Sequence, residues 1–174
     1  MIRTILLTFL VVWMAAGVQA QEEYTTDSPQ AEKSFKEALR SYRLRDHEKA
    51  LEQIAQALQH DKDFLEAYIL RGQVYEDQHQ YEKAIVSYRK VLDMDASFYP
   101  RLLYNTGKLE FETGRYEQAR GHFSRYKNRE EGGPIKQNQA QHYINSCDFA
   151  MEQKRDPVPF SPSNLGPTVN SRFH

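Results

Sequence analysis

The stretch "AYILRGQVYEDQHQYEKAIVSYRKVL", residues 67–92, reads as two amphipathic helices joined by a short polar turn. Before the turn, Tyr68, Gly72 and Tyr75 recur at i, i+4 and i+7, the spacing of one helical face. After the turn, apolar residues follow Ala84 at i+4, i+7 and i+8, which predicts a second helix with one buried face. The small side chains of Gly72 and Ala84 predict the place where the two helices cross closely.

This second helix recurs on both sides of the stretch. The strings "HEKA" (47–50), "YEKA" (81–84) and "YEQA" (116–119) place their alanines 34 and 35 residues apart, and an amphipathic helix precedes each of them. One helix pair cannot bury its apolar face alone, so the pairs are expected to stack and share a core. The positions that define this core are Ala50, Tyr68, Gly72, Tyr75, Tyr81, Ala84, Tyr88, Gly107, Tyr116, Ala119 and Phe123.

A helix pair of this length, with Gly and Tyr on its first helix and Tyr-x-x-Ala at the start of its second, resembles the tetratricopeptide repeat. The match is strongest in the middle unit; in the first unit, Ser34 and Ala38 stand where the middle unit has Tyr68 and Gly72. The resemblance implies an all-α tetratricopeptide-repeat solenoid of about three helix pairs. The three repeats are expected within residues 28–131, at about 31–62, 65–96 and 100–128.

Helix boundary signals agree with this organisation. Ser28 followed by Pro29 predicts a helix start, because a hydroxyl cap precedes a proline at the first helical position. Turns within the pairs are expected at 44–46, 78–80 and 113–115. A Gly-Gly-Pro sequence then precedes a last helix at 134–155, expected to cap the exposed face of the final repeat. Cys147, the single cysteine, lies on the apolar stripe of this helix and is expected to pack in the core.

Residues 1–20 have the pattern of a secretory signal peptide. Arg3 precedes a nearly uncharged apolar run at 5–18, and Val-Gln-Ala then predicts cleavage between Ala20 and Gln21. The run is short for a membrane span, so no stable span is expected after cleavage; an uncleaved anchor is the alternative. The mature net charge of 22 − 24 = −2 gives no reason to expect nucleic acid as a partner.

The C-terminal part of the chain supplies a second resemblance. The strings "CDFA" (147–150), "PVPF" (157–160), "NLG" (164–166) and "VNS" (169–171) resemble the junction in a family of exported Bacteroidetes proteins. In that family a tetratricopeptide module continues into a WD40-like β-propeller and often an OmpA-like domain, and one member belongs to the type IX secretion apparatus. The resemblance implies that residues 156–174 are an extended linker at the start of an absent propeller. Either the sequence is a fragment or the module acts alone.

No pattern of catalytic, cofactor-binding or metal-binding residues stands out. The six histidines include no pair at i+3 or i+4 on one helix, which argues against a helical metal site. Asp93 and Asp95 lack the further oxygen ligands and the turn glycine of a calcium loop. Neither a glycine-rich phosphate loop nor a nucleophile elbow is present. The chain is therefore expected to be no enzyme and to need no cofactor.

The remaining candidate site is a groove. In tetratricopeptide stacks the first helix of each pair lines the concave surface, and the resemblance implies that a protein or peptide segment binds there. The expected groove residues are Ile69, Gln73, Glu76, Asp77, Arg101, Tyr104, Lys108 and Glu112. The alternative is that these residues are solvated and Tyr104 belongs to the core. A carboxylate clamp of the chaperone-binding type is not expected, because Phe35, Leu39 and Leu70 occupy sites that would need polar groups.

Three interpretations of function follow. The first is a periplasmic interaction scaffold of a cell-envelope complex, associated with the outer membrane through its partners; a role in secretion is one form of this interpretation. The second is a structural spacer to a propeller or OmpA-like part. The third, a subunit with an unrecognised enzymatic site, is disfavoured by the absence of clustered His, Cys or paired acids in the sequence.

Overall fold

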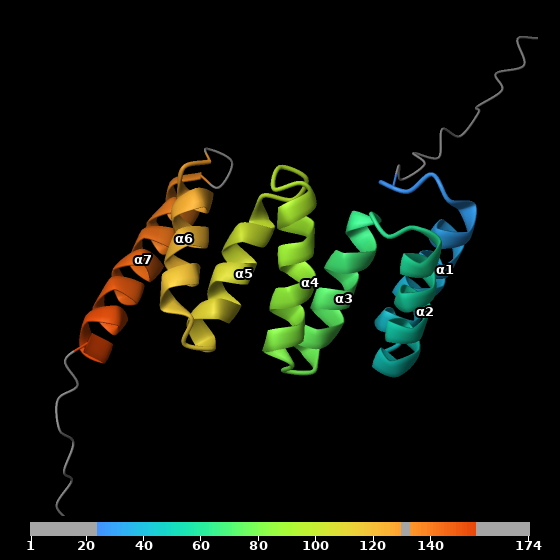
Figure 1. Cartoon of the computed structure of the whole chain (residues 1–174), viewed down its shortest axis with the longest axis horizontal. Helices are drawn as coiled ribbons and strands as arrows, with labels where there is room; N and C mark the ends of the chain where they lie inside the picture. The colour runs from blue at the N-terminus through green and yellow to red at the C-terminus, as the bar shows by residue number, and fades with distance from the viewer. Residues whose placement is uncertain (1–23, 130–132, 156–174) are drawn as a thin grey trace, which may run out of the picture.

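The computed structural model describes residues 24–129 and 133–155, and all regular structure in these two ranges is α-helical. The seven helices stand side by side in an elongated row (Figure 1). They are α1 (Pro29–Arg43), α2 (His47–His60), α3 (Leu65–Asp77), α4 (Tyr81–Met94), α5 (Arg101–Glu112), α6 (Tyr116–Lys127) and α7 (Gly133–Arg155). The predicted all-α solenoid of three helix pairs and a terminal helix is confirmed. Residues 1–23, 130–132 and 156–174, which include the predicted signal peptide and tail, lie outside the described ranges.

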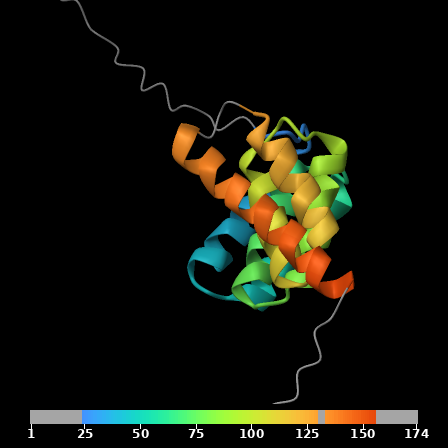
Figure 2. The same cartoon turned by 90° about the vertical axis from the view of Figure 1, so that its left-hand side faces the viewer.

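Three pairs, α1–α2, α3–α4 and α5–α6, follow one another along the row. The terminal helix α7 packs against α6 and lies across the end of the stack (Figure 2). Since each pair leaves an apolar face open to the next, α7 covers a face of the last pair that would otherwise meet water.

The helix starts at α1 and α2 are set by side-chain caps. Ser28 Oγ accepts a hydrogen bond of 3.3 Å from the Ala31 amide, which confirms the predicted cap at the start of α1. At α2, Asp46 Oδ1 accepts a 3.2 Å bond from the Lys49 amide. Each cap satisfies one of the backbone donors that a helix N-terminus leaves without an intrahelical partner.

The three turns within the pairs share one backbone design. Arg45, His79 and Gly114 occupy the same place in each turn and have φ values of 62°, 57° and 74°. In each turn the following amide bonds back to a carbonyl five residues earlier, as Arg115 N does to Glu110 O at 2.7 Å. This is the Schellman arrangement, which ends a helix with one residue in the left-handed region.

The interior consists of two clusters of buried side chains, one formed mainly by α1–α3 and the other by α3–α7. Of the predicted core positions, Ala50, Gly72, Ala84, Tyr88, Gly107, Ala119 and Phe123 are buried. Tyr68, Tyr75, Tyr81 and Tyr116 are half-buried and pack against the second cluster from outside. The tyrosines that the sequence groups with the core thus include one fully buried ring, Tyr88, and several rings at the margin.

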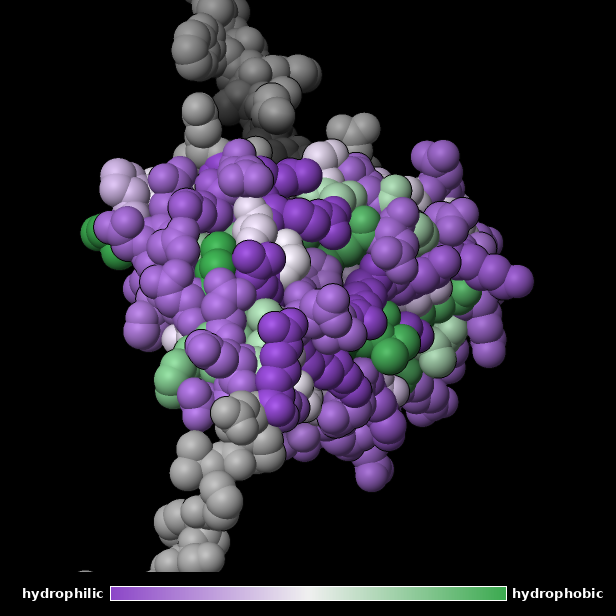
Figure 3. Space-filling model, turned by 60° about the vertical axis from the view of Figure 1, so that its left-hand side comes forward, coloured by the Kyte–Doolittle hydropathy of each residue, from purple (hydrophilic) through white to green (hydrophobic). Residues whose placement is uncertain are grey.

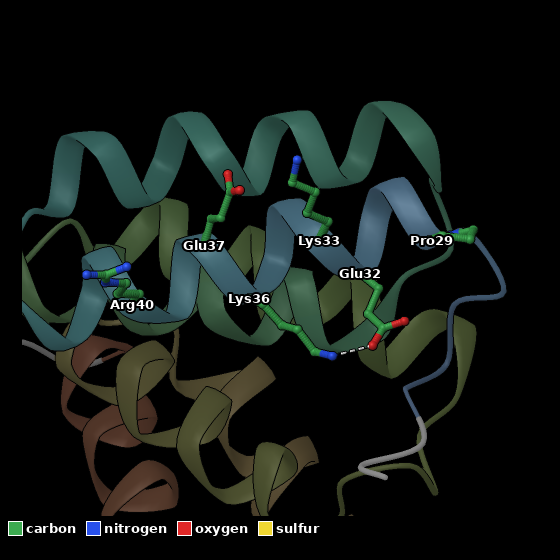
Figure 4. A pocket seen from close by; sticks show the side chains of 6 residues that line it. All are labelled: Pro29, Glu32, Lys33, Lys36, Glu37 and Arg40. Carbon is green, nitrogen blue, oxygen red and sulfur yellow. Dashed lines mark hydrogen bonds and ion pairs between the residues drawn. The ribbon is translucent and has the colours of Figure 1, made fainter.

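The two ends of the stack differ in character. At the first end, α1 presents a charged depression of about 420 Å³, with Lys33 and Glu37 on one side of the helix and Glu32 and Lys36 on the other (Figure 4). Its lining residues are Pro29, Glu32, Lys33, Lys36, Glu37 and Arg40. A polar outer face of this kind is typical of a terminal repeat in a solenoid.

At the other end, α7 buries a single stripe formed by Ala140, Ile144 and Cys147. The core packing predicted for Cys147 is confirmed, and burial raises the pKa of its thiol to about 11. Phe149 remains 64% exposed, and the surface at this end is largely hydrophilic with small separate apolar patches (Figure 3). Among the described helices, none combines the length and the apolar character required to cross a membrane.

Candidate peptide-binding groove

An aromatic pocket of about 640 Å³ opens between α5 and α7. Tyr104 and Phe111 contribute from α5, and Tyr143 contributes from α7. The complete lining is Tyr104, Phe111, Ile135, Asn138, Gln139, His142, Tyr143 and Ser146. A pocket of this size, with apolar walls and a few polar groups, has the usual make-up of a binding site. We call it the α5–α7 pocket.

A packed group of rings holds the walls of the α5–α7 pocket in place. Tyr143 stacks on Phe123 with centroids 4.6 Å apart and planes 8° from parallel. Tyr104 meets Phe123 edge-on at 5.5 Å and Tyr143 at 5.9 Å, while Phe111 meets Tyr143 at 5.6 Å. Each of these geometries is favourable for aromatic pairs. Burial and the neighbouring Tyr143 raise the pKa of the Tyr104 hydroxyl.

The α7 side of the pocket supplies its polar groups. Asn138 and Gln139 carry amides that both donate and accept hydrogen bonds. No hydrogen bond between described residues engages either amide. The Ser146 hydroxyl donates to the His142 carbonyl at 3.0 Å, so it is already used within the helix. Ile135 stands at the pocket with 76% of its surface exposed.

Of the expected groove residues on α5, only Tyr104 lines the α5–α7 pocket. Arg101 and Lys108 lie three residues before and four residues after it, on the same face of the helix. Arg101 and Glu112 are exposed and Lys108 is half-buried. No ion pair joins Arg101 or Lys108 to an acidic group within the two described ranges, so the helical face of α5 that holds Tyr104 carries two cations without an acidic partner there.

Most of the expected groove residues on α3 have contacts inside the fold. Glu76 Oε2 accepts a 2.9 Å hydrogen bond from the hydroxyl of Tyr88. Asp77 pairs with Arg45 at 3.3 Å, which ties α3 to the turn between α1 and α2. Ile69 is half-buried against the second core cluster, and Gln73 is exposed. Three of the four therefore have structural contacts in addition to any role toward a partner: Glu76 and Asp77 through polar partners, and Ile69 through packing.

The carboxylates of Glu76 and Asp77 also affect the pKa values of two neighbouring tyrosine hydroxyls. Burial raises the pKa of Tyr88, and the carboxylate of Glu76 raises it further. Burial and the neighbouring Asp77 likewise raise the pKa of Tyr42. Both hydroxyls therefore stay protonated and act as hydrogen-bond donors at neutral pH.

A polar network around one buried carboxylate, absent from the sequence predictions, joins the second pair to the third. Glu110 on α5 has a fully buried side chain. Its Oε1 accepts bonds of 2.9 and 2.7 Å from Nε and Nη2 of Arg89 on α4, and its Oε2 lies 2.6 Å from Nδ1 of His122 on α6. One feature of the sequence could have predicted this network: Glu110 lies next to the apolar stripe of its helix, and a carboxylate that is buried there needs partners.

The chain's own N-terminal segment covers the start of α3. Thr25 Oγ1 donates to Glu66 Oε2 at 2.6 Å and accepts from the Leu65 amide at 3.0 Å. The ring of Tyr24 meets Phe35 edge-on at 5.2 Å and Phe64 at 6.0 Å. Because Phe64 gives α3 no side-chain cap, Thr25 supplies that bond from a distant part of the chain.

Within the residues that the structure describes, no group of three or more His, Cys, Asp or Glu side chains is placed to hold a metal ion.

Comparison with known proteins supports the architecture. Residues 65–98 match the tetratricopeptide repeat. Over 81 residues the chain is 37% identical to anaphase-promoting complex subunit 3 of Schizosaccharomyces pombe; the match spans 47% of this chain and 12% of that protein.

Solved structures resemble more of the chain. The Sgt2 tetratricopeptide domain from Aspergillus fumigatus is 17% identical with a TM-score of 0.58, covering 82% of this chain and 93% of that one. The secretion chaperone SycD of Yersinia enterocolitica, in complex with a peptide of the translocator YopD, is also 17% identical, with a TM-score of 0.57 and coverage of 73% and 96%. At these identities the likeness concerns the fold, and the chain has the all-α fold of a tetratricopeptide-repeat solenoid.

Proposed function

We propose that this protein is a non-catalytic interaction scaffold that binds a protein or peptide segment in the groove along its first helices. Tetratricopeptide domains mediate protein–protein interaction, and a similar structure holds a translocator peptide. The observation that carries the proposal for this chain is the α5–α7 pocket, with aromatic walls and free amides, beside the helical face of α5 that carries Arg101 and Lys108. Recognition through a few apolar anchors and nearby polar groups is typical of peptide-binding surfaces.

The proposed place of action is the periplasm, in a cell-envelope complex associated with the outer membrane and serving secretion. The support is the leader pattern of residues 1–20 and the resemblance of the C-terminal strings to exported Bacteroidetes proteins. Intact-mass measurement on protein from the envelope fraction should give a chain that starts at Gln21. A product that keeps Met1 and remains in the cytoplasm would refute this part of the proposal.

Affinity capture tests the scaffold itself. The protein should retain a defined partner from envelope extracts, and the double variant Arg101→Glu, Lys108→Glu should lose it while its helical content stays the same. The control Lys49→Glu reverses an exposed charge on α2, on a helix outside the proposed groove, and should retain the partner. Capture of the same partner by the double variant would show that the partner binds away from this face, and capture of no partner by the unaltered protein would favour the spacer interpretation.

A further inference from the structure

We infer that the α5–α7 pocket selects an acidic peptide segment that inserts one aromatic or branched aliphatic side chain between Tyr104, Phe111 and Tyr143. This inference rests on the proposed groove function and adds the chemistry of the ligand. It departs from recognition of a C-terminal carboxylate, because the anchor here is an internal apolar side chain.

The apolar anchor follows from the walls of the pocket. Three rings from two helices face a space of about 640 Å³, within the range of about 300–1,000 Å³ that is typical of small-ligand sites. The stacking of Tyr143 on Phe123 fixes the α7 wall before any ligand arrives. Ile135, three-quarters exposed, extends the apolar surface outward. An inserted ring would gain both area burial and edge-to-face contacts.

The acidic character follows from the charges on α5. Arg101 and Lys108 flank Tyr104 on one helical face, about one turn away on either side. The exposed acid on this face, Glu112, lies a further turn along, next to Phe111. A ligand carboxylate on either side of the anchor would therefore meet a cation that no described acidic residue neutralises, and like charges in the ligand would be repelled.

The backbone of the segment has its own partners in the pocket. Asn138 and Gln139 lie one turn from Tyr143 on α7, and their amides can bond to a peptide N–H or C=O. Such contacts do not depend on the ligand sequence, so they add affinity while the apolar anchor and the acidic flanks provide specificity.

The experiment uses short synthetic peptides blocked at both ends, so that no terminal carboxylate is available. One peptide has a single Phe between Asp and Glu residues, the second has Ala for that Phe, and the third has Lys for the acids. Fluorescence anisotropy with the purified protein should show binding of the first peptide, with the Ala and Lys peptides at least about tenfold weaker.

Two matched substitutions place the ligand. Gln139→Trp should fill the pocket and weaken binding at least about tenfold, since the anchor loses its site. Gln153→Trp adds the same ring to an exposed position of α7 that does not line the pocket, and should leave binding within about twofold. Circular dichroism should show equal helicity for both variants.

The inference fails if the Phe and Ala peptides bind equally, if no peptide binds, or if Gln139→Trp binds like Gln153→Trp. It also fails if the protein self-associates and Gln139→Trp abolishes that association, because the occupant is then a second copy. A partner captured from envelope extracts regardless of Gln139→Trp would leave the scaffold function intact and overturn only the pocket assignment. Peptide binding without any captured partner would support the pocket assignment and overturn the scaffold function in the envelope.

Discussion

The ring of Tyr88 fills the space in which a side chain of Gly72 would stand. A Cβ atom built on Gly72 would lie 2.1 Å from Cε1 and 2.5 Å from Cδ1 of that ring. Tyr88 is 1% exposed, and its hydroxyl is held by Glu76, so the ring has no free direction in which to move. The same spacing of 16 residues joins Gly107 to Phe123, where the closest approach of a built Cβ would be 3.1 Å.

Gly72→Ala should therefore lower the free energy of unfolding by about 1–3 kcal/mol, the usual cost of an overpacked core. The control Gly121→Ala lies in α6 with no atom within 4 Å of the added Cβ, so it should raise stability by up to about 1 kcal/mol through helix propensity. Urea unfolding measures both. An unchanged or higher midpoint for Gly72→Ala would mean that Tyr88 does not occupy this space.

The first helix pair suggests how to rescue that variant. Its equivalent positions, also 16 residues apart, are Ala38 and Ile54, and both are fully buried. The first pair thus has an alanine where the middle pair has Gly72, and an isoleucine, smaller than tyrosine, where the middle pair has Tyr88. Tyr88→Ile should consequently cost less in the Gly72→Ala background than alone, with a coupling energy of about 0.5–3 kcal/mol in a double-mutant cycle. Simple additivity of the two changes would argue against direct contact.

Glycine is required for a different reason in the turn between α5 and α6. Gly114 has a φ of 74°, and a Cβ added there would make only an ordinary contact with Lys154 Nζ at 3.6 Å. Gly114→Ala should cost about 1–2 kcal/mol, because an L side chain is strained in the left-handed region. The control His79→Ala exchanges one side chain for another at the same turn position and should change stability far less. Thermal unfolding of the two variants distinguishes backbone strain from loss of side-chain contacts.

Local patterns were sufficient to predict the helix pairs and their turns. The 34-residue recurrence, the apolar spacing after each alanine and the small residues at Gly72 and Gly107 all concern positions within one unit. Because the same local pattern recurs in each unit, the sequence predicts the helix pair several times over.

Features that depend on packing between units were not predictable in the same way. Arg89, Glu110 and His122 come from three helices and meet only because α4, α5 and α6 pack together. The α5–α7 pocket needs Tyr143, whose helix has no repeat template and follows a break in the pattern. Among the groove residues expected on α3, Glu76 and Asp77 bond inside the fold, a use that helical periodicity alone does not reveal.

The buried carboxylate of Glu110 should be important for stability. Glu110→Gln keeps an acceptor but removes the charge that faces Arg89 and His122, so we expect a loss of about 1–3 kcal/mol. Glu112→Gln, the same exchange at an exposed position of the same helix, should stay within about 0.5 kcal/mol. Denaturant midpoints give both values. Equal midpoints for the two variants would show that the network contributes no net stability.

The thiol of Cys147 should be inert in the folded protein. Burial raises its pKa to about 11, so at pH 8 the thiol stays protonated, whereas an unfolded chain with an ordinary thiol pKa would hold an appreciable thiolate fraction. Because the folded pKa is the higher one, thiol reactivity in the native state should appear only as the pH approaches that value. Labelling with a chromogenic disulfide at pH 8 should be slow in buffer and fast in denaturant. The variant Gln153→Cys adds an exposed thiol on the same helix and should show one fast and one slow site; labelling of the native protein as fast as that added thiol would contradict the buried position of Cys147.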